Sequence, residues 1–383
     1  MPQPVSAWKE AALEPEIDMH QPPYAIERLG VLMSADSTDP REAWGVLNPA
    51  SARGRDGQLY LFPRLVAQGN VSRIGRARVV CDDAGVPRSV ERLGVVLEAQ
   101  ESWEKNGSGG GVEDPRITYV PRLDQYVMAY AAYGPLGPRV ALAASTDLVR
   151  WMRLGPVSFT YDSQLGIDFQ LVPNKDAMLF PEPVPGPDGE LSYAMLHRPM
   201  WDLSWIREGA GEPLPRGLSD PRPGIWVSYV RASAVEADIG ALTMLGHHRL
   251  VALPEQPWES LKIGGGTAPV RVEDGWLTLF HGVSGELVRD TVLQPKVRYA
   301  AGVLILDAAD VSRVVARSAQ PLLEPEVSEE LDGIVPNVVF PTALEPAAEG
   351  EAFVFYGMAD SRIGVARLRK LEDGEIHTRP SGT

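Results

Sequence analysis

Two adjacent carboxylates, Glu113 and Asp114, follow a run of three glycines and stand directly before a proline and an arginine. Glycine lets the backbone turn sharply and approach its surroundings closely, because it carries no Cβ. Pro115 disfavours the helical region for the residue before it, so we expect Asp114 to be extended, at the start of a strand over residues 117–120. A carboxylate displayed there beside a guanidinium is a candidate general acid, although most Glu-Asp pairs in loops are only solvated.

The elements that must position this acid repeat along the chain. Five segments share an acidic or glycine turn, an apolar run and polar residues at the end: 56–64, 124–130, 190–198, 274–281 and 351–360. Shorter strands are expected before them at 47–50, 114–120, 180–184, 267–272 and 338–342, and others after them at 73–80, 139–144, 225–230, 299–306 and 362–368. Roughly seventy residues per unit and scarce helical periodicity predict an all-β fold, a five-bladed β-propeller. A β-sandwich with long loops would not explain why the same strand recurs.

In a propeller the innermost strands of all blades converge on one axial mouth, so residues far apart in sequence share a pocket. The polar residues at the corresponding strand ends are Asn48, Arg64, Arg73, Asp114, Arg198, His281, Tyr299 and Asp360. Several basic groups and two carboxylates predict a site for an anion and a polar substrate. The alternative, which the sequence leaves open, is that some of these basic residues form ion pairs between blades.

Composition limits the classes of partner and the kinds of site that we expect for this chain. The 383 residues carry a formal net charge of −15, which argues against nucleic acid and anionic membranes as partners. No apolar run reaches the length of about 18 residues that a membrane span needs, and residues 1–13 lack a signal-peptide core, so we expect an intracellular, cytoplasmic protein. The single Cys81 excludes an internal disulfide and a multi-cysteine metal site.

Residues 1–30 differ from the rest of the chain. Trp8, Leu13 and Ile17 predict a short helix interrupted by Pro15, so we expect an N-terminal helical extension that acts as a docking arm or subunit contact. The catalytic propeller is expected to cover residues 31–375. Whether the chain forms a homo-oligomer is not determined by the sequence.

Between residues 45 and 370 a series of short motifs occurs in a fixed order. The motifs are Asn48-Pro49-Ala50, 60–64, 70–75, 111–118, 175–182, 196–199, Lys262-Ile263-Gly264-Gly265-Gly266, 281–283, 323–326, 335–342 and Tyr356-Gly357-Met358-Ala359-Asp360. This series resembles that of the β-mannoside phosphorylases of glycoside hydrolase family 130, which are five-bladed propellers. No single motif is decisive, but the ordered series is specific.

The resemblance implies roles for individual residues. Asp114 would be the general acid, acting through the 3-hydroxyl of the mannosyl unit, which relays the proton to the glycosidic oxygen. The phosphate-binding residues would be Arg198, Lys262, His281 and Tyr299, and Asn48, Arg64, Arg73 and Asp360 would line the mannosyl and phosphate pocket. The partners would be a β-mannosidic oligosaccharide and inorganic phosphate as co-substrate, with no metal and no cofactor.

The implied reaction is inverting phosphorolysis of a β-mannoside to α-mannose 1-phosphate and a shortened acceptor. An inverting hydrolase needs a second carboxylate to activate water, whereas a phosphorylase needs cations to hold its anionic nucleophile. Arg198, Lys262 and His281 favour the phosphorylase. The alternatives are an inverting β-mannosidase on the same scaffold and a non-catalytic glycan-binding propeller. The linkage, 1,2 or 1,4, the acceptor sugar and the preferred chain length stay open.

Three other stretches are interpreted more plainly. His247-His248 is expected on a solvated loop, and the glycines at 264–266 lack the spacing of a phosphate-binding P-loop. Residues 200–223, with Trp201 and Trp205, are an insertion that leaves the acceptor side of the site undefined.

Overall fold

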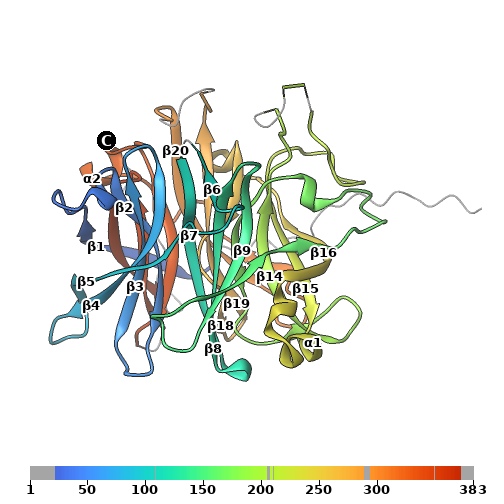
Figure 1. Cartoon of the computed structure of the whole chain (residues 1–383), viewed down its shortest axis with the longest axis horizontal. Coiled ribbons are helices and arrows are strands. Elements are labelled where there is room, and N and C mark those ends of the chain that lie inside the picture. Colours follow the sequence, from blue (N-terminus) through green and yellow to red (C-terminus); the bar gives the residue numbers. More distant parts are fainter. Residues whose placement is uncertain are drawn as a thin grey trace, which may run out of the picture.

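The computed structural model describes residues 22–107, 109–204, 208–209, 211–288, 294–348 and 350–371. Strands dominate these residues and form sheets of four, nine, six and five strands (Figure 1). The nine-stranded sheet contains two blades, joined by a short parallel contact of Val71 and Ser72 with Gly110 and Gly111. The fold is therefore a five-bladed β-propeller, and the predicted fold class is confirmed.

Each blade has four main strands, which follow one another from the axis outward. Blade I contains β2 (Gly45–Arg53), β3 (Leu59–Ala67), β4 (Val71–Cys81) and β5 (Pro87–Glu98), and blade II contains β7 (Gly109–Val120), β8 (Gln125–Gly134), β9 (Gly137–Ser145) and β10 (Met152–Pro156). Blade III contains β12 (Asn174–Leu179), β14 (Leu191–Pro199), β15 (Ile225–Arg231) and β16 (Met244–Ala252), and blade IV contains β17 (Lys262–Gly265), β19 (Gly275–Gly285), β20 (Val297–Leu306) and β21 (Val314–Arg317). Blade V contains β22 (Val339–Pro346), β23 (Glu351–Met358), β24 (Arg362–Lys370) and β1 (Tyr24–Ser34). Short elements between them are β6 (Lys105–Asn106), β11 (Ser158–Phe159), β13 (Val184–Pro185), β18 (Val270–Val272), α1 (Ala232–Ala237) and α2 (Ser328–Leu331).

The second strands β3, β8, β14, β19 and β23 lie where the sequence predicts them. They are apolar on both faces because a neighbouring blade covers each face, as at Leu61 and Phe62. Two innermost strands differ from the prediction. The innermost strand of blade III is expected at 180–184, but the structure has it earlier, as β12, which ends at Leu179. In blade IV a single strand is expected at 267–272, but the structure has two shorter strands, β17 and β18. These strands face the axial cavity, so their polar residues hide the apolar pattern that prediction relies on.

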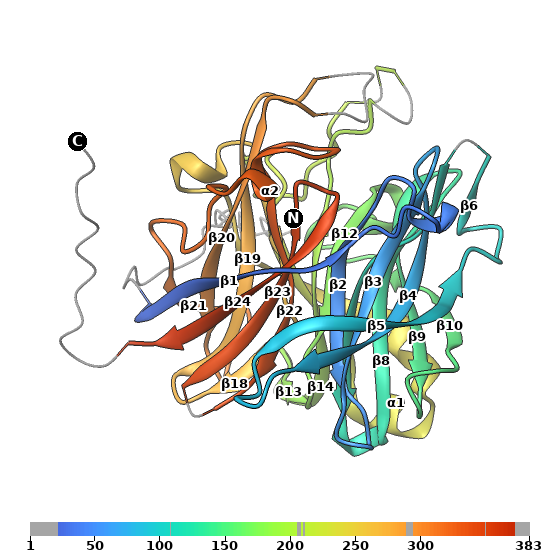
Figure 2. The same cartoon turned by 90° about the vertical axis from the view of Figure 1, so that its left-hand side faces the viewer.

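The two ends of the described chain meet in blade V. β1 pairs antiparallel with β24 along its whole length, so the first described strand is the outermost strand of the last blade (Figure 2). Residues 24–30 therefore belong to the propeller, and a domain boundary at residue 30 falls inside a paired strand. The helix expected around residues 8–17 lies outside the described residues.

A buried glutamate recurs in the connection before the innermost strand of four blades. Its carboxylate accepts backbone N–H groups of its own turn and pairs with an arginine of the fourth strand, which satisfies both charges. The pairs are Glu42–Arg92 in blade I, Glu104–Arg153 in blade II, Glu259–Arg317 in blade IV and Glu330–Arg28 in blade V. The four glutamates are at most 2 % exposed.

Blade III replaces this ion pair by a neutral chain of hydrogen bonds. His248 Nε2 donates to the Thr160 carbonyl at 2.8 Å, so its Nδ1 accepts from Ser228 Oγ at 2.7 Å. Ser228 Oγ in turn accepts from His197 Nε2 at 2.7 Å. Burial lowers the pKa of both histidines, which keeps them uncharged. The prediction that His247-His248 is a solvated loop is therefore wrong for His248, which is fully buried in β16.

None of the described helices is long and apolar enough to cross a membrane. In the same residues, no three His, Cys, Asp or Glu side chains are grouped so that they could hold a metal ion.

Replacing Arg317 by methionine should lower the free energy of unfolding by about 3–5 kcal/mol, because Glu259 would stay buried with an unpaired charge. The double variant Glu259→Gln/Arg317→Met should recover most of this loss, since a neutral amide still accepts the N–H groups of Glu255 and Gln256. Denaturant unfolding followed by circular dichroism measures both. Arg88→Met, which removes an exposed partner of Asp82, is the control. Equal effects of the two arginine substitutions would contradict this role for Arg317.

Candidate active site

The innermost strands of blades I, II and III carry the same local irregularity. Asn48, Asp114 and Asp176 have φ values of 43°, 47° and 53°, and the strand pairing skips two residues at each of them. Such a bulge redirects a side chain that would otherwise follow the strand alternation. Asp and Asn tolerate this left-handed conformation better than other residues with a side chain. All three side chains line one cavity of about 510 Å³ on the propeller axis.

The expectation that Pro115 keeps Asp114 extended is wrong, because the bulge places Asp114 in the left-handed region. The preceding glycines make this possible. A Cβ on Gly110 would lie 2.5 Å from the Tyr133 carbonyl oxygen, and one on Gly111 would lie 2.3 Å from the Ser72 carbonyl oxygen. The glycine run therefore brings β7 into close contact with its neighbours on either side.

Asp114 is held by a network on the blade I side of the cavity. Its Oδ1 accepts from Asn48 Nδ2 at 2.9 Å and from Arg64 Nη1 at 3.1 Å. Arg64 also donates to Glu113 Oε1 at 2.9 Å, and Lys175 Nζ donates to Glu113 Oε2 at 3.1 Å. Each carboxylate of the Glu-Asp pair is thus held by a cation from another strand.

The two carboxyls on this side of the cavity have opposite pKa shifts. Burial by itself would raise the pKa of Asp114, but the charges of Arg64, Lys175 and Arg116 outweigh it and hold the pKa below its usual value. Burial and the nearby Asp114 raise the pKa of Asp360 to about 6, which Arg64 only partly offsets. Near neutral pH Asp114 is therefore ionised, whereas Asp360 keeps a small protonated fraction and is half protonated only near pH 6.

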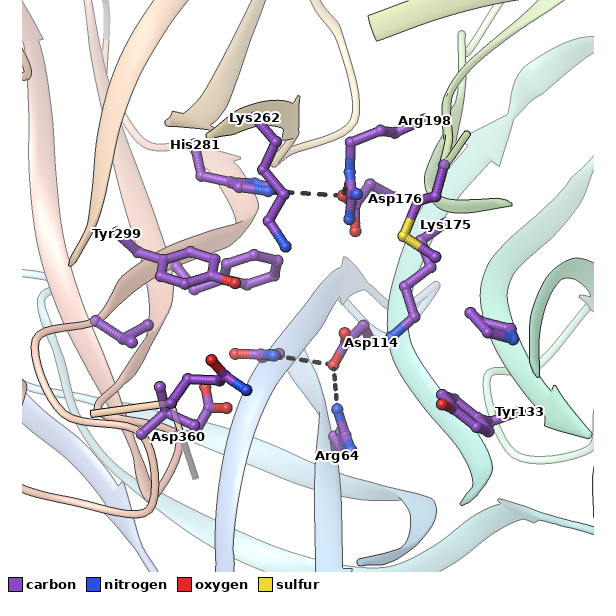
Figure 3. Close-up of a pocket in the computed structure, with 17 residues that line it drawn as sticks. Arg64, Asp114, Tyr133, Lys175, Asp176, Arg198, Lys262, His281, Tyr299 and Asp360 are labelled. Carbon is purple, nitrogen blue, oxygen red and sulfur yellow. Dashed lines mark hydrogen bonds and ion pairs between the residues drawn. The ribbon is translucent and has the colours of Figure 1, made fainter. Parts of the chain in front are cut away.

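The opposite side of the cavity is cationic. Figure 3 shows Arg198, Lys262 and His281 grouped around Asp176, with Arg64, Asp114 and Asp360 across the cavity. Arg198 Nε donates to Asp176 Oδ2 at 2.6 Å, and His281 Nε2 lies 3.6 Å from the same oxygen. The Nη1 of Arg198 and both ring nitrogens of His281 are buried without a hydrogen-bond partner among the described residues. Buried donors without partners are what an anion site requires.

Burial changes the charge of this cationic side. It lowers the pKa of Lys262 to about 7, helped by the neighbouring charges of Arg198 and Lys175. It also lowers the pKa of His281 to about 3, an effect that Asp176 only partly offsets, so this imidazole is neutral. A bound dianion would favour the charged form of Lys262 and accept an N–H from His281. Burial raises the pKa of Tyr299, so its hydroxyl keeps its proton and can donate as well.

The glycines that follow Lys262 have a packing role. A Cβ on Gly264 would lie 2.4 Å from Asp176 Oδ2, and one on Gly265 would lie 1.9 Å from the Met178 methyl carbon. This explains a glycine run without P-loop spacing: it lets β17 approach the side chains of blade III.

Eight of the nine residues predicted for the site line the cavity: Asn48, Arg64, Asp114, Arg198, Lys262, His281, Tyr299 and Asp360. Arg73 does not line it. Leu65 is its partner in the strand pairing, and Arg64 pairs with Ile74, so strand alternation turns Arg73 to the face opposite Arg64. Instead, Arg73 Nε lies 3.6 Å from Glu98 Oε2.

Sequence reasoning assigned no role to several residues of the site. Lys175 and Asp176 stand in a motif of the family resemblance, but the expected strand began after them. The signal that could have found them is their place in the repeat, since Asp176 occupies in blade III the bulge that holds Asp114 in blade II.

The further lining residues are Tyr133, Pro138, Met200, Gln294, Val335, Val338 and Phe340. Met200 belongs to the unaligned insertion, in which Trp201 is anchored in the blade III core and Trp205 lies outside the described residues.

A carboxyl group that faces a group of cations across a cavity of about 510 Å³, on the axis of a five-bladed propeller, is the arrangement of a glycoside-cleaving enzyme. Residues 14–373 match the family model described as beta-1,4-mannooligosaccharide phosphorylase, and the chain belongs to that family, glycoside hydrolase family 130.

Named relatives agree with this assignment. The β-1,2-mannobiose phosphorylase of Thermoanaerobacter sp. (strain X514) is 33% identical over 274 residues, which are 71% of this chain and 68% of the relative. The 1,2-β-oligomannan phosphorylase of the same organism is 32% identical over 262 residues, 67% of this chain and 68% of the relative. The solved β-1,2-mannobiose phosphorylase from Listeria innocua superimposes with a TM-score of 0.64 over 90% of this chain and 96% of that one, at 21% identity, a likeness of fold.

Lys262→Ala and His281→Ala should each weaken the apparent affinity for phosphate about 10- to 100-fold, the equivalent of about 1.5–3 kcal/mol per charge-assisted contact. The KM for the glycoside should change much less, since both residues lie across the cavity from Asp114 and Arg64. Initial rates measured against phosphate and against glycoside separate the two effects. Lys370→Ala, the same substitution on the outer part of blade V, is the control. An unchanged phosphate dependence in both site variants would make these residues structural.

Proposed function

We propose that this protein cleaves β-mannosides with inorganic phosphate and inverts the anomeric carbon, which gives α-mannose 1-phosphate and a shortened acceptor. The observation that supports this proposal most directly is the placement of Asp114 across the cavity from Arg198, Lys262 and His281 (Figure 3). An inverting displacement needs the nucleophile on one face of the sugar ring and the acid on the other. A sugar held between the two sides meets that requirement.

Phosphate binding and acid catalysis are coupled in this scheme. Asp114 is ionised before phosphate binds, so it must take up a proton before it can act as an acid. A phosphate dianion on the opposite side adds negative charge and raises the pKa of Asp114. Asp360, with a pKa of about 6, is a neighbouring carboxyl that holds a proton under mildly acidic conditions. In this proposal the proton reaches the glycosidic oxygen through the 3-hydroxyl of the mannosyl unit, the relay that the family resemblance implies.

Direct hydrolysis would need a base on the nucleophile side of the cavity. The carboxylate that lies there, Asp176, is bound by Arg198 at 2.6 Å, and its pKa is held below the usual range by Arg198, His281 and Arg116 despite burial. Such a carboxylate is a weak base for water. These contacts favour phosphate over water as the nucleophile.

For the linkage we propose β-1,2-mannobiose and β-1,2-mannooligosaccharides as the preferred substrates. This part of the proposal is supported by the relatives at 33% and 32% identity, both named for 1,2-linked substrates. The family model carries a 1,4 description, so both linkages belong in the same experiment.

Purified protein given β-1,2-mannobiose should release mannose 1-phosphate only when phosphate is present, because the cation-lined side of the cavity needs an anionic nucleophile. Chromatography of the products with and without phosphate tests this, with β-1,4-mannobiose as the linkage comparison. Free mannose formed at an equal rate without phosphate would establish the hydrolase instead.

Asp114→Asn should lower turnover of an unactivated β-mannoside by about 10²- to 10⁴-fold, the usual contribution of a general acid. The amide keeps the left-handed backbone and the contact with Arg64 but has no proton to transfer. β-Mannosyl fluoride, whose leaving group needs no proton, should be affected much less. Equal losses on both substrates would mean that Asp114 only holds the sugar, and full activity on the disaccharide would refute its role.

A further inference from the structure

Asp176 makes more ion-pair contacts than the other carboxylates that line the cavity. The proposed reaction nevertheless assigns it no catalytic role. It is 5% exposed and lies in the bulge of β12 with a left-handed backbone. Its Oδ2 accepts from Arg198 Nε at 2.6 Å and lies 3.6 Å from His281 Nε2, and its Oδ1 lies 3.9 Å from Arg116 Nη2. β17 packs against Asp176, and a side chain at Gly264 would collide with its carboxylate.

These contacts fix the direction of the Arg198 guanidinium. Because Nε is occupied by Asp176, the Nη groups extend beyond the carboxylate, and Nη1 has no partner among the described residues. Arg116 donates to the carbonyl oxygens of Asp114, Gly265 and Gly266, so it adds charge but is not free to reach a ligand. Arg198 and Lys262 are therefore the cations on this side of the cavity that can contact an anion.

The same carboxylate sets the charge of the site. Three cations, Arg116, Arg198 and Lys262, surround the single negative charge of Asp176. When Lys262 is protonated, two positive charges remain, which match a hydrogen-phosphate dianion. The groups that face Asp176 come from five other strands: Arg116 on β7, Arg198 on β14, Lys262 on β17, His281 on β19 and Tyr299 on β20. Lys175 precedes it on β12, and its ammonium is held by Glu113.

We infer that Asp176 is the positioning residue of the anion site: it aligns Arg198 toward the ligand and supplies the fixed negative charge that lets Lys262 stay charged beside Arg198. This inference rests on the proposed function for its biological meaning, but it concerns anion binding and can be tested without turnover. Lys262 is the group that responds, because its pKa of about 7 is already lowered by burial and by Arg198. Loss of the Asp176 charge removes the main opposing effect.

The test uses sulfate, which keeps both negative charges between about pH 5.5 and pH 9, whereas phosphate itself titrates in that range. Calorimetry gives the sulfate Kd of the native protein and of Asp176→Asn across this range. Asparagine tolerates the left-handed backbone, and Asp176→Gly, which accepts it freely, serves if the asparagine variant does not fold. Asp188→Asn, in an exposed turn of the same blade, is the matched control.

In the native protein the affinity for sulfate should fall as the pH rises through about 7, where Lys262 loses its proton. In Asp176→Asn this fall should occur at least about one pH unit lower, which makes binding about 5- to 10-fold weaker at pH 7. Near pH 5.5, where Lys262 is charged in both proteins, the difference should vanish or reverse, because the asparagine oxygen can still accept from Arg198 Nε and sulfate no longer faces a carboxylate. Lys262→Met should remove the fall near pH 7 and leave only the change near pH 6 that the titration of Asp360 causes, and Asp188→Asn should match the native profile.

A uniform loss of sulfate affinity at every pH, with an unshifted midpoint, would overturn the inference and leave Asp176 a structural residue.

The kinetics should agree: Asp176→Asn raises the KM for phosphate at pH 7.5 and leaves the KM for the mannoside within about twofold. The two proposals fail separately. A protein that releases mannose without phosphate refutes the proposed reaction, whereas a native protein that requires phosphate while Asp176→Asn keeps the native sulfate profile refutes only the role of Asp176.

Discussion

The site depends on one backbone constraint, the left-handed bulge that recurs in the innermost strands of blades I, II and III. A regular strand would alternate its side chains between two neighbouring blades, where polar groups would have to be buried in apolar contacts. The bulge turns Asn48, Asp114 and Asp176 toward the axis instead. In blade IV the corresponding place is taken by glycines, which provide room for the residues that the other blades contribute.

Buried charges of two kinds serve different purposes in this fold. The Glu–Arg pairs between the connections and the fourth strands, such as Glu259 with Arg317, join one blade to its own entry turn. The axial cavity instead leaves donors without partners among the described residues, at Arg198 Nη1 and at His281. A buried donor without a partner lowers the free energy of unfolding. The cavity therefore makes the fold less stable than it could be, and its donors stay available to a ligand.

The distribution of charge also explains how one cavity can favour phosphorolysis. Before phosphate binds, the cationic neighbours of Asp114 keep it ionised, so it has no proton to give. Water that enters the site meets no carboxylate that is a competent base on the cationic side, because Asp176 is held by Arg198. A dianion changes both conditions, since it is itself the nucleophile and its charge favours protonation of Asp114.

The sequence by itself determined the five repeats, the second strand of every blade and seven residues of the cavity, because apolar strands buried on both faces with polar residues at their ends leave a regular pattern. An eighth residue, Lys262, followed only from the resemblance to a known family. The tertiary structure decided the rest. The closing of the ring by β1, the turn of Arg73 away from the cavity and the left-handed backbone at Asp114 depend on strand pairing and register. Asp176 was missed because β12 is polar on its axial side, and His248 was placed on the surface because its partners Thr160 and Ser228 are distant in sequence. Pairing and burial join residues far apart in the chain, and a local pattern does not record which of them meet.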